Sequence, residues 1–318
     1  MGEKGFYNIN NLNFSTSKKE LSLEAKIAEE KLVDNFYREL LNNGKDSISG
    51  ELFKTDQEKI MIRRFNQYIE EAAAEVGVTN LRPPLLTKKI HFAAPEGYDK
   101  EFPEHGDSVR GSYDAIVDAA YIKKNKGMHP WQIAHYTLHE MVHSFSAIHY
   151  NLDLEGEFNY KKIGYDSVKL RDNSSKKMEA SSLLGDSEDS EEVDHLFLAF
   201  NEGVTDLMTK EILEKHKVDL IKDLELDESD LENNPLEYHN AIYFVNWIMK
   251  KIVEKTNEDR EVVWKKFKVG MLTGSIMHLR EIEKNLGPGS LRLIAKVGKN
   301  NEDNLAFLEF MKNYDKNN

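Results

Sequence analysis

Apolar residues recur at three- and four-residue steps in two segments near the start of the chain, and this spacing predicts amphipathic helices. The first segment runs from Leu23 to Leu41. The second begins at Thr55, which forms a capping-box pattern with Glu58, and ends near Gly77. These two helices predict an N-terminal helical region over residues 1–84.

Two short segments with β-branched or aromatic residues, Lys89–Ala93 and Ala119–Lys123, predict strands of a small mixed sheet. Glycines and prolines interrupt the sequence between them. A helical pattern resumes after Pro130 and extends to Phe145. We therefore expect residues 85–150 to form the upper part of a second domain.

The rest of the chain is first polar and then helical. Residues 151–194 form a polar region that ends in an acidic run over 186–194. The acidic run has the pattern of a solvated, mobile loop. From Leu196 onward the apolar spacing is that of helices. The sequence thus predicts an α+β, mainly helical protein whose second domain covers 85–318, with 151–318 as its lower helical part.

Composition and charge narrow the classes of function. The chain has 43 Lys plus Arg against 56 Asp plus Glu, a formal charge of −13, which repels phosphate backbones and anionic membrane surfaces. We therefore expect neither nucleic acid nor a membrane as a partner. No signal-like or membrane-spanning apolar stretch is present, so the expected location is cytoplasmic. Because the chain has no cysteine, any bound metal must have His, Asp or Glu ligands.

The helix after Pro130 contains His139, Glu140 and His143 in the order His-Glu-x-x-His. Four residues make slightly more than one helical turn, so both imidazoles project from one face and can bind a single ion. Glu140 lies beside them, where a carboxylate can act as a base. A catalytic zinc usually has three protein ligands, so a third ligand must come from elsewhere in the chain.

Two residues compete for the third position. Glu202 is followed one helical turn later by Asp206, which can accept a hydrogen bond from a ligating histidine. His149 has the HExxHxxGxxH spacing, but Ser146 replaces the glycine. That glycine normally turns the chain in a left-handed conformation, which serine adopts only at a cost. The pattern favours Glu202 and leaves His149 open.

The two motifs together resemble those of the gluzincins, the thermolysin-like branch of the zincin metallopeptidases. Their pattern is HExxH on one helix and NExxxD on the next. The matching residues are His139, Glu140, His143, Asn201, Glu202 and Asp206. The resemblance covers roughly residues 88–213. It implies a zincin-like fold, with a small mixed sheet over the HExxH helix and a helical lower subdomain.

The resemblance also implies a site and a reaction. His139, His143 and Glu202 would bind Zn²⁺, Glu140 would be the general base, and Asp206 would orient a ligating histidine. The protein would then be a zinc metallopeptidase acting on a peptide or protein. In this reaction zinc acidifies water and polarises the scissile carbonyl, and the base passes a proton to the leaving amine.

Two further features follow from the same resemblance. The strand at Ala119–Lys123 corresponds to the edge strand that pairs with extended substrate in zincins. Thermolysin-like enzymes also use a downstream Tyr or His to stabilise the oxyanion. Among His239, Tyr243, His278 and Tyr238, we choose Tyr238.

Two other functions remain open. One is a metzincin-like peptidase with His149 as the third ligand. The other is a regulatory or toxin-associated protein that uses the same fold to bind one partner. His135 lies one turn before His139, but three histidines over two turns cannot all reach one ion. We interpret His135 as lining the cleft or as a hydrogen-bonded core residue.

Overall fold

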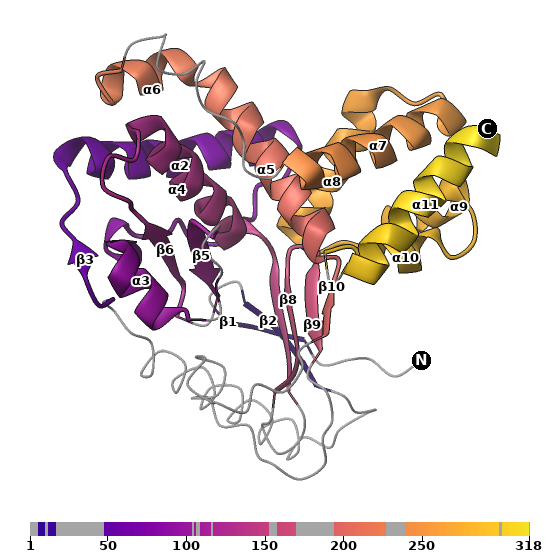
Figure 1. Cartoon of the computed structure of the whole chain (residues 1–318), viewed down its shortest axis with the longest axis horizontal. Coiled ribbons are helices and arrows are strands. Elements are labelled where there is room, and N and C mark those ends of the chain that lie inside the picture. The colour runs from indigo at the N-terminus through magenta and orange to yellow at the C-terminus, as the bar shows by residue number, and fades with distance from the viewer. Residues whose placement is uncertain are drawn as a thin grey trace.

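A computed structural model shows the protein as a mixed α+β fold (Figure 1). Two small sheets accompany a larger number of helices, which confirms the coarse class expected from the sequence. The structure describes residues 6–9, 12–16, 48–103, 105, 109–115, 117–152, 158–169, 194–226, 239–298 and 301–317.

Strands β3 to β6 form a four-stranded sheet, which lies on the left in Figure 1. In spatial order its strands are β3 (Glu51–Leu52), β4 (Ile90–Ala93), β6 (Ala119–Lys123) and β5 (Gly111–Asp114). β4 and β6 are parallel, whereas β5 is antiparallel to β6. Both expected strands are therefore present.

The expectation that Ala119–Lys123 is the edge strand is wrong. β6 lies inside the sheet, between β4 and β5. The glycine-containing segment before β6 supplies an additional strand, β5, which pairs with the side of β6 that would otherwise be open. Among the described strands, β5 is thus the edge beside helix α4 (Pro130–Phe145).

Helix α2 (Asp56–Glu75) confirms the second predicted N-terminal helix and its start. The Thr55 hydroxyl accepts from the Glu58 N–H at 3.2 Å, and the Glu58 carboxylate accepts from the Thr55 N–H at 2.8 Å. The apolar face of α2 is buried and contacts α4. The other predicted helix, Leu23–Leu41, lies outside the described residues.

The second sheet has six described strands and is not predicted by the apolar pattern. They are β1 (Phe6–Ile9), β2 (Leu12–Thr16), β7 (Ile148–Leu152), β8 (Phe158–Ile163), β9 (Asp166–Lys169) and β10 (Asp194–Leu196), in that spatial order. β2 pairs with β7 in parallel, so the start of the chain lies beside the segment that follows α4.

This sheet corrects two expectations. Strands occupy parts of the polar region 151–194, which the sequence pattern places in a lower helical part, and two strands precede the first predicted helix. The reason is that strands β8 and β9 contain lysines, Asn159 and Asp166 without a regular apolar alternation, and their pairing is decided by contacts with distant strands. The acidic run over 186–194 lies outside the described residues except for Asp194.

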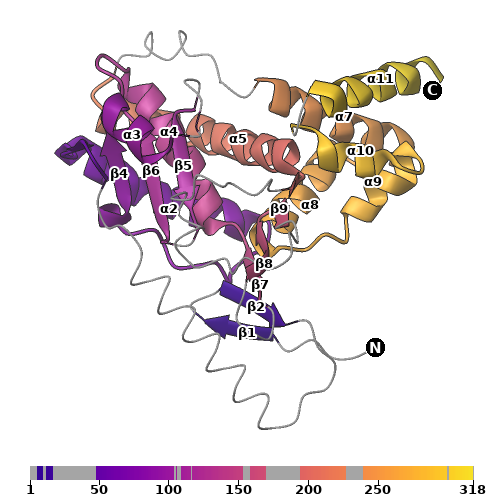
Figure 2. The ribbon, with the colours of Figure 1, turned by 60° about the horizontal axis from the view of Figure 1, so that its bottom comes forward.

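Helices dominate the chain after Leu196, as predicted. They are α5 (Leu198–Lys215), α6 (Lys217–Asp223), α7 (His239–Thr256), α8 (Arg260–Thr273), α9 (Leu279–Leu286), α10 (Ser290–Lys296) and α11 (Asn301–Asn317). Helix α3 (Pro95–Glu101) and a 3-10 turn at Thr87–Lys89 lie earlier in the chain. In Figure 2, α5 runs between the half with β4 to β6 and the half with α7 to α11.

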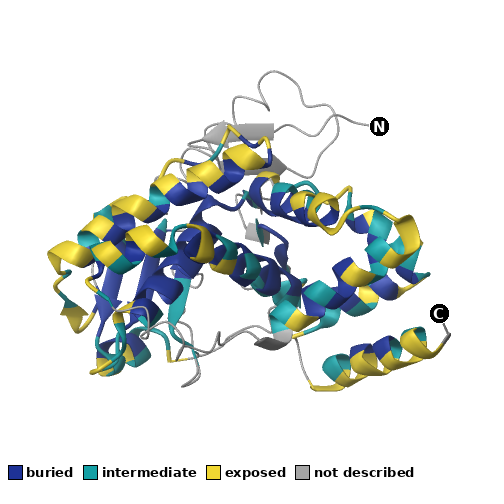
Figure 3. Ribbon diagram, turned by 90° about the horizontal axis from the view of Figure 1, so that it is seen from above, coloured by how far each residue is buried: buried dark blue, intermediate teal, exposed yellow. Residues whose placement is uncertain are grey.

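Buried residues gather where the helices and sheets face one another (Figure 3). α4 and α5 contact each other in this interior, and α5 also contacts α7 and α8. In the described part of the chain, every helix is too short or too polar to cross a membrane.

Candidate metal centre

Helix α4 carries both histidines of the motif and Glu140. Pro130 opens the helix at a position where no N–H is needed, and His129 caps it by accepting the Trp131 N–H at 3.2 Å. The helix is buried along almost its whole length. The side chains of His139 and His143 are accordingly only 2% and 9% exposed.

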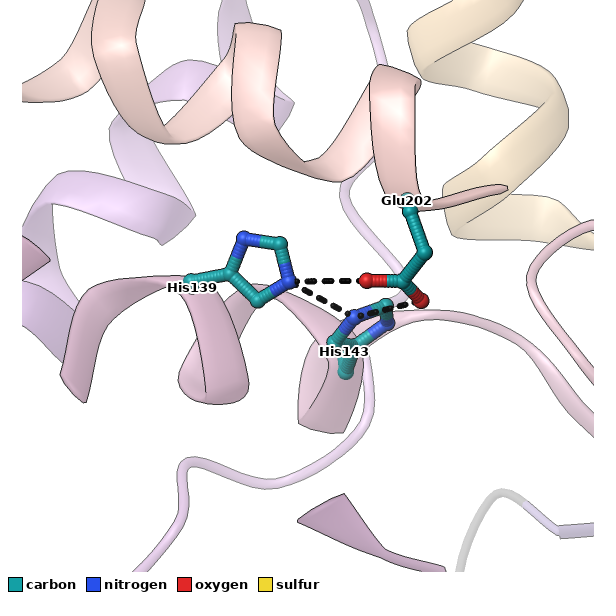
Figure 4. A group of neighbouring side chains, drawn as sticks. All are labelled: His139, His143 and Glu202. Carbon is teal, nitrogen blue, oxygen red and sulfur yellow. Dashed lines mark hydrogen bonds and ion pairs between the residues drawn. The ribbon is translucent and has the colours of Figure 1, made fainter. Parts of the chain in front are cut away.

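Helix α5 brings Glu202 to the histidine pair. Glu202 Oε2 lies 3.1 Å from His139 Nε2, and its Oε1 lies 3.3 Å from His143 Nε2. The two Nε2 atoms are 3.1 Å apart. In Figure 4 the two imidazoles from α4 and the carboxylate from α5 point toward one another. The sequence separation between His139 and Glu202 is 63 residues, so the helix pair creates this proximity.

These three side chains can hold a metal ion. Their ligand atoms all lie within 4.8 Å of one another. A tetrahedral ion that binds nitrogen or oxygen at about 2.0–2.1 Å separates its ligand atoms by about 3.3–3.4 Å, close to the spacing present here. Within the described residues, His139, His143 and Glu202 are the group that satisfies this requirement.

His149 is not part of this group. Helix α4 ends at Phe145, and Ser146 has φ −64° and ψ 152°. The chain therefore leaves the helix in an extended conformation, without the left-handed residue that would turn it back. His149 lies on β7, opposite Lys162 of β8. Of the two candidates for the third ligand, the structure places Glu202 at the histidines.

Asp206 lies fully buried one turn after Glu202 and contacts two histidines of α4. Its Oδ1 is 3.5 Å from His139 Nδ1 and 2.8 Å from His135 Nε2. Asp206 is therefore placed where it can orient the His139 ring while Nε2 faces the ligand group, and this role stays a prediction. His135 is a hydrogen-bonded core histidine, which agrees with its interpretation from the sequence.

Asn201 is a residue whose role the sequence reasoning missed. Its side-chain Nδ2 lies 3.4 Å from His143 Nδ1, and its Oδ1 accepts the backbone N–H of Tyr165 at 2.9 Å. Asn201 thus links His143 to the turn between β8 and β9, but its amide can only donate to Nδ1, whereas the Asp206 carboxylate accepts from Nδ1 of His139. The sequence signal that could have revealed this role is the position of Asn201 directly before Glu202 in the NExxxD motif.

The electrostatics of the group favour a positive charge at its centre. Burial alone would lower the pKa of His139, but hydrogen bonds to Asp206 and Glu202 outweigh it and raise the pKa to about 10. Burial alone would raise the pKa of Glu202, but attraction to His143 and hydrogen bonds with both histidines hold it well below its ordinary value. In the metal-free protein, His139 therefore carries a proton at the position where a cation would bind.

Metal binding at pH 7 is therefore expected to release about one proton, because His139 must free Nε2 before it can coordinate. As the pH falls below about 10, protons compete with the metal, and the apparent affinity is expected to drop by up to about tenfold per unit. Calorimetric titration with ZnCl₂ in two buffers of different ionisation enthalpy measures the release. Equal heats in both buffers would contradict the release of a proton from His139 on metal binding.

Glu140 lies against the edge strand β5. It is 5% exposed, and its carboxylate accepts the backbone N–H of Tyr113. A Cβ at Gly111 would lie 2.6 Å from Glu140 Oε1, so only glycine permits this close approach. Burial raises the pKa of Glu140, although His139 and the other imidazole oppose the shift.

The predicted oxyanion residue, Tyr238, lies outside the described residues, and its role stays a prediction. Helix α7 begins at the next residue, His239. Gly203, beside Glu202, allows α7 to approach closely, since a Cβ there would lie 2.5 Å from the Ala241 carbonyl oxygen. The start of α7 therefore packs against α5 at the residue that follows Glu202. Of the remaining candidates, Tyr243 is 64% exposed. The His278 ring hydrogen-bonds with the Tyr165 hydroxyl.

Comparison with known proteins gives no match: no family model fits the chain, and neither a curated protein nor a solved structure is significantly similar to it.

Proposed function

We propose that this protein is a zinc-dependent metallopeptidase of the gluzincin type, with a zincin-like arrangement of α4, α5 and the four-stranded sheet. The observation that carries the proposal is the convergence of His139, His143 and Glu202, with Glu140 directly beside them and facing an edge strand. A simple metal store would need the three ligands but no buried carboxylate beside them.

Zinc is the ion that best suits this donor set. Two imidazoles and one carboxylate from a rigid helix pair provide three ligands at a tetrahedral spacing, which leaves a fourth position for water or substrate. Mg²⁺ and Ca²⁺ prefer sites made of oxygen ligands. When bound, zinc supplies a Lewis acid that acidifies water and polarises a carbonyl.

The protein residues would then perform the proton transfers. Glu140 would accept a proton from the attacking water and deliver it to the leaving amine. Its burial and raised pKa suit this shuttle, because a higher pKa makes the carboxylate a stronger base toward the attacking water. Asp206 and Asn201 would keep the two imidazoles in place during these steps.

The edge of β5 that no described strand covers would bind the substrate as an extended peptide. The Arg110 carbonyl accepts the Lys123 N–H, so by the alternation of antiparallel pairs Gly111 and Tyr113 direct their backbone groups away from β6. The Tyr113 N–H already contacts Glu140. A peptide paired with this edge would place its backbone next to the general base. This supports a peptide or protein substrate.

We expect the zinc-loaded protein to cleave fluorescein-labelled casein or members of a quenched-fluorescence peptide library. Because the reaction depends on the ion, 1,10-phenanthroline should stop the cleavage, and added ZnCl₂ should restore it. A protein that holds one zinc per chain but cleaves none of these peptides would contradict the proposed function.

A further inference from the structure

Arg82 is a buried cation in the segment that follows α2. Its side chain is 7% exposed. Nη1 donates to the hydroxyl of Tyr113 at 2.6 Å and to the backbone carbonyl of Ser144 at 2.7 Å. Nη2 donates to the carboxylate of Asp118 at 3.0 Å. A buried guanidinium with several directed contacts of this kind holds separate parts of a fold at fixed distances.

The contacts of Arg82 lie on the elements that meet at Glu140. Tyr113 belongs to β5, and its backbone N–H donates to the Glu140 carboxylate. Ser144 belongs to the last turn of α4, one turn after Glu140. Arg82 therefore joins the strand that donates this hydrogen bond to the helix that accepts it.

The third contact of Arg82, with Asp118, completes a network of three side chains. Asp118 follows β5 in the turn toward β6 and has a left-handed φ of 51°, which Asp adopts more readily than most residues. Its carboxylate accepts from Arg82 and also from the Tyr113 hydroxyl at 2.7 Å. The three side chains thus form a closed triangle, which fixes the β5–β6 turn as well as β5 itself.

Little movement of β5 is possible without disturbing Glu140. The Gly111 backbone already lies so close that an added Cβ would be 2.9 Å from Glu140 Cγ. In active sites, a displacement of about 1 Å can reduce the rate on the order of a hundredfold. The distance between β5 and α4 must therefore be fixed if Glu140 is to keep its position.

We propose that Arg82 is a positioning residue that holds β5 at the height above α4 where the Tyr113 N–H meets Glu140. The inference rests on the proposed function insofar as Glu140 is the general base. It extends that function by assigning the placement of the base to a side chain outside both motifs.

The test uses Tyr113→Phe, which removes only the hydroxyl, and Arg82→Lys, which keeps the charge but loses the planar fork. Lys268→Met is the matched control, because it removes another buried cation from an ion pair, that of Lys268 on α8 with Glu211 on α5. Each full-length protein is loaded with zinc. Bound zinc, thermal stability, hydrogen–deuterium exchange of the β5 peptide, and kcat and KM on the best-cleaved library peptide are then compared.

We expect Tyr113→Phe and Arg82→Lys to exchange the β5 amides about tenfold faster and to lose about tenfold in kcat, with bound zinc close to wild type. A rise in KM would accompany these changes, because the loosened β5 is also the strand proposed to pair with the substrate. Lys268→Met should lose thermal stability without any of these changes. Wild-type β5 exchange and wild-type kcat in Tyr113→Phe would overturn the proposal even if Arg82→Lys fails to fold. If the wild-type protein cleaves no peptide, the proposed function fails, whereas the exchange comparison still decides whether Arg82 holds β5.

Discussion

Glu202→Ala is expected to lose nearly all of its bound zinc under dialysis that leaves the wild type loaded. The carboxylate is the candidate ligand on α5, while the two other candidate ligands are on α4. Zinc binding of about 10–16 kcal/mol over four ligands is roughly 3 kcal/mol for each, so the affinity should fall on the order of a hundredfold or more. The free histidines would also keep their positions, since Asp206 and Asn201 remain.

Elemental analysis of zinc per chain, after identical dialysis, measures this loss. His149→Ala is the matched control, because His149 belongs to the alternative ligand set but lies on β7. We expect about one zinc per chain in the wild type and in the control. Loss of zinc from His149→Ala, with retention in Glu202→Ala, would transfer the third position to His149 and refute the gluzincin arrangement.

Glu140→Gln is expected to reduce peptide hydrolysis by about 10²- to 10⁴-fold while leaving bound zinc unchanged. Glutamine has the shape of glutamate but cannot accept the proton of the attacking water. Because Glu140 is not one of the three converging ligands, the metal site itself should survive. The measurement is kcat/KM on a library peptide at equal zinc loading.

The same variant separates catalysis from binding. A regulatory protein that recognises one partner through this fold would keep its biological effect in Glu140→Gln, because the shape and the metal site are retained. Loss of the effect together with hydrolysis would instead assign the effect to catalysis. Hydrolysis at the wild-type rate in Glu140→Gln would refute the role of Glu140 as the base.

The helices could be predicted because their signals are local. The reciprocal hydrogen bonds of Thr55 and Glu58 lie within one turn, and the apolar spacing of α4 follows from contacts of a single helix with the core. The signal for the candidate metal ligands on α4 was equally local, since His139 and His143 share one face at a spacing of four. Glu202 required a second motif, and its meeting with the histidines depends on helix packing.

Strand order and supporting residues could not be predicted in the same way. The position of β6 inside the sheet depends on pairing with β4 and β5, which periodicity within Ala119–Lys123 does not encode. Likewise, Arg82 reaches Ser144 across 62 positions, and no spacing rule links an arginine after one helix to a carbonyl at the end of another. Tertiary contacts of this kind determine where Glu140 lies, although Glu140 itself is visible in the sequence.

The division of the candidate metal ligands between α4 and α5 affects the order of events during folding. Because 63 positions separate His139 from Glu202, the complete site forms only after a long loop has closed, and the metal cannot nucleate the fold locally. Loop-closure entropy grows slowly with length, so doubling the connection would cost only about 0.6 kcal/mol. The segment between the two helices can therefore accept insertions during evolution at little entropic cost, wherever they leave the pairing of β7 to β10 and the Tyr165–Asn201 hydrogen bond intact.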